Sequence, residues 1–210
     1  VLIIITGSTI AVKAQQQIGN SDLELWENVG TDTEEPINWN GFMTAQGGLT
    51  WAAAKQCERA TDTRPGSSGV YSARVYSRSA AFGIVANGNL TLGRINMGSS
   101  TATSSDNYNV SLTANTSFSE ALTDQPDSLV FWVKYSAANG QLARVSAVLH
   151  GSYDYRDGYV AHDPSQAYKV AEISHNYPPT GGNWVRKSIP WNYTGPLTDN
   201  TFVLITFATN

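Results

Sequence analysis

Apolar and polar residues alternate along much of this chain with the period of two that half-buried β-strands show. The segment VYSARVYS at residues 70–77 is the clearest example, because it places Tyr71, Ala73 and Val75 on one face. Similar runs are bounded by turns rich in Gly, Asn and Pro. We expect further strands at residues 81–86, 90–95, 128–135, 142–150, 168–174, 184–190 and 201–208.

Three of the segments carry more specific expectations. The dipeptide Asn87-Gly88 lies between two apolar runs, which is a strong signal for a β-hairpin. The run SLVFWVKY at 128–135 is almost wholly apolar and predicts a central strand, with Trp132 in the core. Residues 51–60 are the one helix-like stretch, and they fit a strand equally well.

Strands that recur at short intervals between turns are typical of a β-sandwich or barrel. No amphipathic helices alternate with them, which disfavours a βαβ fold. The fold class we predict is therefore all-β, an antiparallel β-sandwich. The loops at 97–118 and 151–167 are long, and long loops in compact domains often carry a ligand site.

The first 14 residues, VLIIITGSTIAVKA, resemble the end of a secretory signal peptide that lacks its own N-terminus. Val12 and Ala14 fit the −3 and −1 positions of a cleavage site before Gln15. The alternative is a first core strand at residues 1–5. The apolar run is too short to span a membrane. We therefore expect a secreted or cell-surface protein in which residues 15–210 form one domain.

Composition narrows the class further. Charged residues make up 14% of the 210 residues, against about 25% in typical soluble domains. The net charge of −4 excludes a strongly basic nucleic-acid binder. The single cysteine, Cys57, excludes a disulfide scaffold and is expected to be a buried thiol. No nucleophile elbow, zinc helix, P-loop or dinucleotide motif occurs, so no catalytic site is predicted.

The most polar segment is the loop GSYDYRDGY at 151–159. Aromatic rings can cover the apolar face of a sugar while carboxylates accept hydrogen bonds from its hydroxyls. We therefore predict a ligand loop formed by Tyr153, Asp154, Tyr155 and Asp157. The alternatives are a solvated structural loop and a calcium-binding loop. Paired carboxylates of a glycosidase are a further option that no spacing in the sequence supports.

Two tryptophans are secondary candidates for stacking on a sugar. Trp39 is flanked by amides and Gly, and Trp191 follows a chain-breaking Pro. Packing in the core is the alternative for both rings.

Several phrases of the sequence recur in a characteristic order. They are NSDLELW at 20–26, EPINWN at 35–40, ANGNLTLGRI at 86–95, QPDSLVFWVKY at 125–135, NWV at 183–185, YTGP at 193–196 and VLITFA at 203–208. In this order they resemble the putative carbohydrate metabolism domain (PCMD) family of exported Bacteroidota proteins. Ser21 departs from the family pattern, which has Gly at that place.

The resemblance implies a jelly-roll β-sandwich like that of carbohydrate-binding modules, with a C-terminal sorting or other domain appended. Family members continue from the strand at 201–208 into a Gly-rich loop and a closing strand, which this sequence does not include. We therefore expect an unpaired edge at 201–208 or at its neighbour. In related jelly rolls, acids of the opening and closing strands hold a structural calcium ion. Glu24 is the candidate here, in a site that would be incomplete.

The resulting hypothesis is a non-catalytic module that binds a glycan or polysaccharide. The main alternative is a structural or adhesive spacer without a sugar site, and the third is a glycoside-active enzyme.

Overall fold

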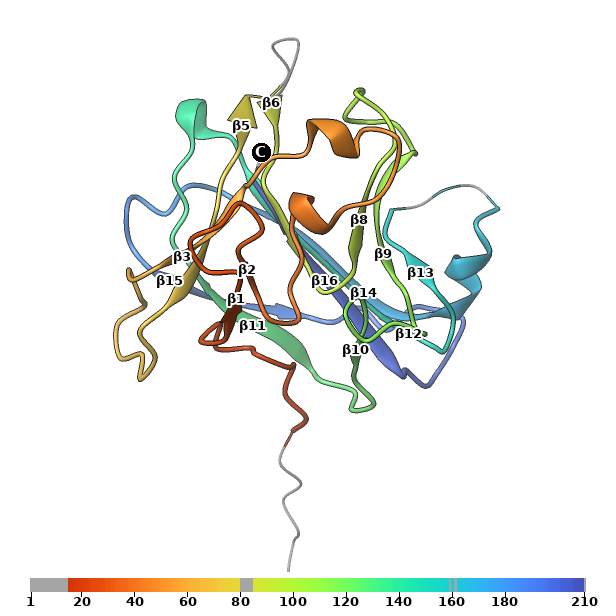
Figure 1. The fold of residues 1–210 in the computed structure, drawn as a ribbon. Coiled ribbons are helices and arrows are strands. Elements are labelled where there is room, and N and C mark those ends of the chain that lie inside the picture. The colour runs from red at the N-terminus through yellow and green to blue at the C-terminus, as the bar shows by residue number, and fades with distance from the viewer. Residues whose placement is uncertain (1–14, 80–84, 159, 161, 210) are drawn as a thin grey trace, which may run out of the picture.

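The strand segments of the sequence pair into an all-β sandwich in the computed structural model (Figure 1), which describes residues 15–79, 85–158, 160 and 162–209. This agrees with the predicted fold class. Short 3-10 turns are the only helical elements within those residues. They are η1 (Phe42–Thr44), η2 (Thr50–Ala52), η4 (Ala138–Gly140) and η5 (Pro164–Tyr168).

The largest sheet of the described residues has five strands. Four of them follow the order β10-β16-β12-β14, and β7 also pairs with β16. All of its neighbouring strands are antiparallel. We call it the central sheet. Its strands are β7 (Asn89–Thr91), β10 (Glu120–Ala121), β12 (Ala143–His150), β14 (Lys169–Tyr177) and β16 (Phe202–Ala208).

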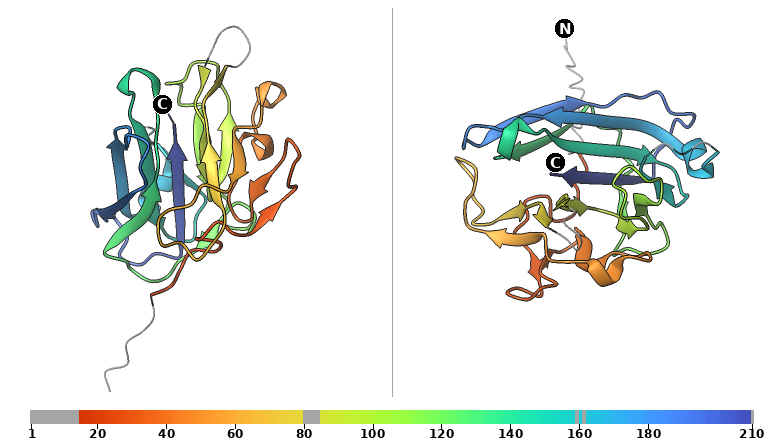
Figure 2. Two further views of the ribbon diagram at one scale, coloured as in Figure 1. Left: turned by 90° about the vertical axis from the view of Figure 1, so that its left-hand side faces the viewer. Right: turned by 90° about the horizontal axis from the view of Figure 1, so that it is seen from above.

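The remaining strands form separate antiparallel pairs and one three-stranded sheet, ordered β13-β9-β8. Figure 2 shows the strands of the N-terminal half, red to yellow-green, on one side of the C-terminal strands. The pairs are β1–β2 (Trp26–Glu27, Glu35–Pro36), β3–β4 (Cys57–Ala60, Ser72–Val75), β5–β6 (Arg78–Ser79, Val85–Ala86) and β11–β15 (Ser128–Val133, Val185–Pro190), and the sheet contains β8 (Arg94–Met97), β9 (Asn107–Ser111) and β13 (Tyr155–Arg156).

Strand β12 is buried on both of its faces. Val145 and Leu149 join the main core, which also receives side chains from β11, β14 and β16. On the other face Val148 packs with Tyr155 and Leu204 in a second cluster. Strands buried on both faces lose the regular alternation of apolar and polar residues, which explains the apolar run at the end of β12.

One strand connection differs from the sequence prediction. The Asn87-Gly88 hairpin does not form in the described residues, because β6 pairs with β5 and β7 pairs with β16. Gly88 instead exchanges hydrogen bonds with Thr209 and lies so close to Tyr76 that a Cβ atom would be 2.6 Å from the carbonyl oxygen. The dipeptide therefore connects the β5–β6 pair to the central sheet. Residues 81–84 lie outside the described residues.

The edge predictions also need correction. Strand β16 has β12 on one side and β10 and β7 on the other, so the strand at 201–208 is not an edge. Its neighbour β10 pairs only with β16 among the described strands, which agrees with the alternative of an edge at a neighbour. Strand β11, expected to be central, pairs only with β15 among the strands that are described. The ambiguous stretch at 51–60 contains the turn η2 and the strand β3. The predicted signal peptide, residues 1–14, lies outside the described part and stays a prediction.

Candidate functional site

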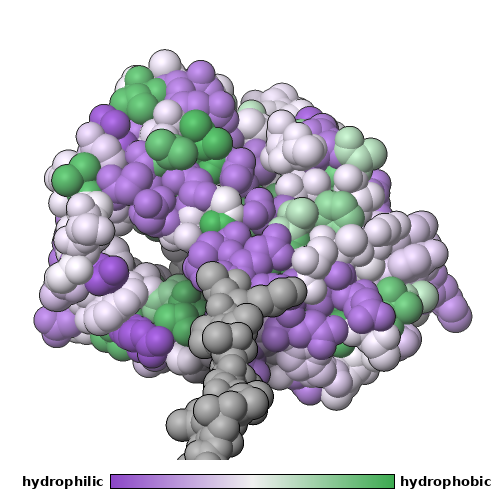
Figure 3. Space-filling model, turned by 90° about the horizontal axis from the view of Figure 1, so that it is seen from below, coloured by the Kyte–Doolittle hydropathy of each residue, from purple (hydrophilic) through white to green (hydrophobic). Residues whose placement is uncertain are grey.

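A cleft of about 680 Å³ lies between strand β11 on one wall and strand β4 with residues 63–69 on the other. Its volume is within the range of small-molecule sites. Figure 3 shows an opening on the lower face of the molecule. The floor of the cleft is apolar, with the side chains of Leu90, Leu129, Phe131, Ile205 and Phe207.

Aromatic and charged groups gather at the mouth of this cleft. Asp62 accepts a hydrogen bond from Lys134 Nζ at 2.6 Å and another from Trp184 Nε1 at 3.0 Å. The hydrogen bond from Lys134 lowers the pKa of the Asp62 carboxyl. The Arg64 guanidinium lies 5.6 Å from the centre of the Trp132 ring. We call Asp62, Arg64, Trp132, Lys134 and Trp184 the mouth cluster.

The alternation of β11 explains why Trp132 faces outward. Leu129 is buried in the core, whereas Val130 and Trp132 are 45% and 38% exposed. Because side chains alternate along a strand, a buried Leu129 places Trp132 on the opposite face. The prediction that Trp132 is a core residue is therefore wrong. The parity of the run could have indicated its exposure, but the continuous apolar composition concealed it.

Glu24 lies on another part of the same cleft. Its Oε1 atom accepts a hydrogen bond from the Tyr71 backbone N–H at 2.9 Å, and Arg59 lies 4.3 Å from the centre of the Tyr71 ring. Calcium takes six to eight oxygen ligands, roughly. No group of three or more Asp, Glu, His or Cys side chains converges in the described residues, and the calcium site with Glu24 stays a prediction.

The side chains of the predicted ligand loop bind neighbouring segments of the chain. Tyr155 is 2% exposed and donates a hydrogen bond to Gln166 Oε1. Asp154 accepts from the Thr113 backbone and hydroxyl, both at 2.8 Å, and Asp157 accepts from the Ser146 hydroxyl at 2.8 Å.

Tyr153, by contrast, is 37% exposed, but one face of its ring stacks on Tyr168 at 4.4 Å. The structure thus places the four predicted residues on one loop. It buries the Tyr155 ring and uses both carboxylates for structural hydrogen bonds.

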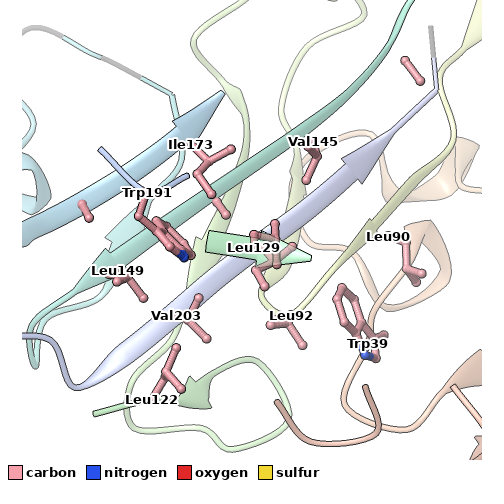
Figure 4. Packing of buried hydrophobic residues seen from close by; sticks show 14 of the residues in the cluster. Trp39, Leu90, Leu92, Leu122, Leu129, Val145, Leu149, Ile173, Trp191 and Val203 are labelled. Carbon is pink, nitrogen blue, oxygen red and sulfur yellow. The ribbon is translucent and has the colours of Figure 1, made fainter. Parts of the chain in front are cut away.

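Trp39 and Trp191 point into the core rather than toward solvent (Figure 4). Their exposed fractions are 6% and 8%, and both belong to the main cluster. Both rings therefore pack in the core, and the Trp39 ring also lines the inner part of the cleft.

Two buried titratable groups lie close together outside the cleft. Glu35 accepts hydrogen bonds from the Gly41 N–H and the Thr44 hydroxyl, and burial raises its pKa to about 7. Burial also raises the pKa of the Cys57 thiol to about 12. The thiol is 3% exposed, as expected for a buried cysteine, and a thiol that stays protonated is a poor nucleophile.

Comparison with known proteins gives a likeness of fold. No family model and no curated protein matches the chain. A solved structure from Bacteroides thetaiotaomicron, described as a "putative glycoside hydrolase", matches with a TM-score of 0.59 and 14% identity. The match covers 94% of this chain and 65% of that chain.

A second structure with the same description, from Bacteroides vulgatus, matches with a TM-score of 0.54 and 15% identity. This match covers 87% of this chain and 80% of that chain. At these identities the likeness shows the fold. The chain also spans less than two thirds of the first of these proteins.

A search of the described residues for membrane spans finds no helix that is long and apolar enough to cross a bilayer.

Proposed function

We propose that this domain binds a glycan without cleaving it, and that the mouth cluster is the binding surface. The observation that carries the proposal is the group of two accessible indole rings with charged partners at one opening. Indole rings offer apolar faces to sugar C–H groups, and Arg64, Lys134 and Asp62 offer donors and acceptors to hydroxyls. Fold neighbours described as glycoside hydrolases support a carbohydrate-related role.

The absence of catalysis is part of the proposal. A glycosidase general acid needs a raised pKa. The carboxyl of the mouth cluster, Asp62, instead has a lowered pKa because Lys134 donates a hydrogen bond to it. Glu35 has a raised pKa but does not line the cleft. We also propose that the domain belongs to the PCMD family and acts outside the cell, because the phrases of the sequence resemble that family.

A glycan array with the purified protein tests the proposal. If a glycan binds, Trp132→Ala and Trp184→Ala should each weaken its affinity about tenfold or more, since stacking on an aromatic ring is lost. Trp51→Ala is the matched control, because Trp51 is 68% exposed and lies outside the cleft.

Three results would contradict this assignment. Equal losses in all three variants would show that the mouth cluster is not the site. Binding to no glycan would favour the structural spacer. Release of reducing sugar ends from a bound polysaccharide would favour an enzyme.

A further inference from the structure

The strand pairs β11–β15 and β3–β4 are separate sheets that we together call the split layer, and one strand of each lines the cleft with an edge that is unpaired among the described strands. Within the described residues β11 pairs only with β15, and β4 pairs only with β3. The cleft of about 680 Å³ separates these two edges. In its interior it is a slot between two strands, and we call this interior the slot.

The backbone of β11 presents hydrogen-bonding groups to the slot. The Trp191 N–H donates to the Asp127 carbonyl at 3.0 Å. This bond shows which residues of β11 direct their backbone groups toward β15. Along an antiparallel strand the backbone groups of successive residues point alternately to its two sides. The N–H and C=O of Val130 and Trp132 therefore point away from β15 and into the slot.

The backbone of β4 does the same from the opposite wall. The Tyr76 N–H donates to the Gln56 carbonyl at 3.1 Å. By the same alternation, the backbone N–H and C=O groups of Tyr71, Ala73 and Val75 point away from β3. The Tyr71 N–H on this edge is already bound by the Glu24 carboxylate at 2.9 Å. The remaining two residues line the slot with no strand partner in the described part.

The lining of the slot suits an extended peptide. Its floor carries apolar side chains, including Phe131 and Phe207, and also Trp39 and Tyr135, whose Nε1 and hydroxyl groups have no hydrogen-bond partner among the described residues. The two walls carry the backbone groups of β11 and β4 that are unpaired in the described part of the chain. An extended peptide satisfies both surfaces, because its backbone pairs with the two edges while alternate side chains cover the floor.

We propose that the slot accepts one β-strand of a partner polypeptide, which pairs with β11 on one side and β4 on the other. The strand would carry apolar residues at alternate positions. Asp22 and Glu24 line the slot, and neither forms an ion pair among the described residues. Arg64 and Lys134 line the same cleft, so a Lys or Arg of the strand complements these carboxylates only where it lies beside Asp22 and Glu24.

Amide hydrogen exchange on the full chain tests this assignment. The probe is a capped seven-residue peptide with Lys at one end, Val at alternate positions and Thr between them. Saturating peptide should slow exchange at Val130, Trp132, Ala73 and Val75 by about tenfold or more, because their N–H groups become paired. A peptide of the same sequence with N-methyl groups on its backbone keeps the side chains but should not protect these amides.

Two substitutions locate the binding. Ala73→Phe places a ring in the slot and should weaken peptide binding at least about tenfold by steric exclusion. Val70→Phe, at a residue that is 59% exposed and outside the slot lining, is the matched control. If Ala73→Phe does not fold, the N-methylated peptide alone decides the question.

Four outcomes would overturn the proposal. The first is the absence of peptide binding, and the second is equal binding of the N-methylated peptide. The third is protection of the four amides without peptide, which would show that the slot is already closed. The fourth is protection that rises with protein concentration, which would show that a second copy fills it. Glycan binding at the mouth cluster is measured separately, so either proposal can fail alone.

Discussion

The central sheet and the split layer differ in how the edges of their strands are paired. In the central sheet β12 and β16 have partner strands on both sides. In the split layer β11 and β4 each have one partner within the described residues, and a cleft separates them. Stability should therefore be concentrated in the first region, and accessible backbone and aromatic groups in the second.

The largest expected contrast is between two apolar truncations. Leu149 of β12 is 0% exposed, so Leu149→Ala should lower the free energy of unfolding by about 2–5 kcal/mol, since a cavity forms. Val130 of β11 is 45% exposed, and Val130→Ala should change it by about 0.5 kcal/mol or less. Urea denaturation of both variants measures the difference. Similar losses would mean that the β11 edge is as well packed as the central sheet.

A buried acid in the N-terminal half should make stability depend on pH. Burial raises the pKa of Glu35 from 4.5 to about 7, so the folded state retains a proton that the unfolded state releases. Stability from this group is present below pH 4.5 and is lost as the pH rises to 7, by about 3 kcal/mol. Glu35→Gln should remove this loss, so the variant should gain stability over the parent at pH 8 but not at pH 4. A constant difference across this range would contradict the assignment.

A buried base in the central sheet should make stability depend on pH in the opposite direction. His150 is 0% exposed, stacks with Tyr155 and Phe202, and its burial lowers its pKa to about 4. The unfolded state binds a proton first, so stability is lost as the pH falls from 6.5 to 4, by about 3 kcal/mol. His150→Phe should abolish this acid dependence while keeping a stacked ring. Denaturation midpoints of parent and variant at pH 7 and pH 5 measure it.

The smallest expected effect is at the mouth cluster. The Lys134–Asp62 pair is largely exposed, so Lys134→Met should leave the free energy of unfolding nearly unchanged. Added salt should reduce even this change, because exposed charges are screened. A loss that is larger and independent of salt would show that the split layer depends on this ion pair.

Much of the strand content could be predicted from local pattern. The expected strands at 142–150, 184–190 and 201–208 correspond to β12, β15 and β16 within a few residues. Their alternation and apolar runs reflect burial, which local sequence encodes. The pairing of strands was harder to predict. Thr91 pairs with Thr206, 115 residues away, and no local signal identifies that contact.

The candidate site shows the same division. Tyr155 and Asp157 were predicted to bind a ligand because rings and acids are concentrated in one loop. Whether such side chains face solvent or their own protein depends on what packs above them, and here Gln166 and Ser146 take their polar atoms. Trp132 and Asp62 belong to segments 70 residues apart, so only folding brings Trp132 into the cleft lining and Asp62 onto Lys134 and Trp184 beside it.

The sequence by itself determined an all-β chain with a buried thiol at Cys57, because period-two alternation and composition act locally. The tertiary structure alone decided which strand edges stay open and which tryptophans reach the surface. Both depend on long-range strand pairing, in which β11 and β4 approach the same cleft from distant parts of the chain.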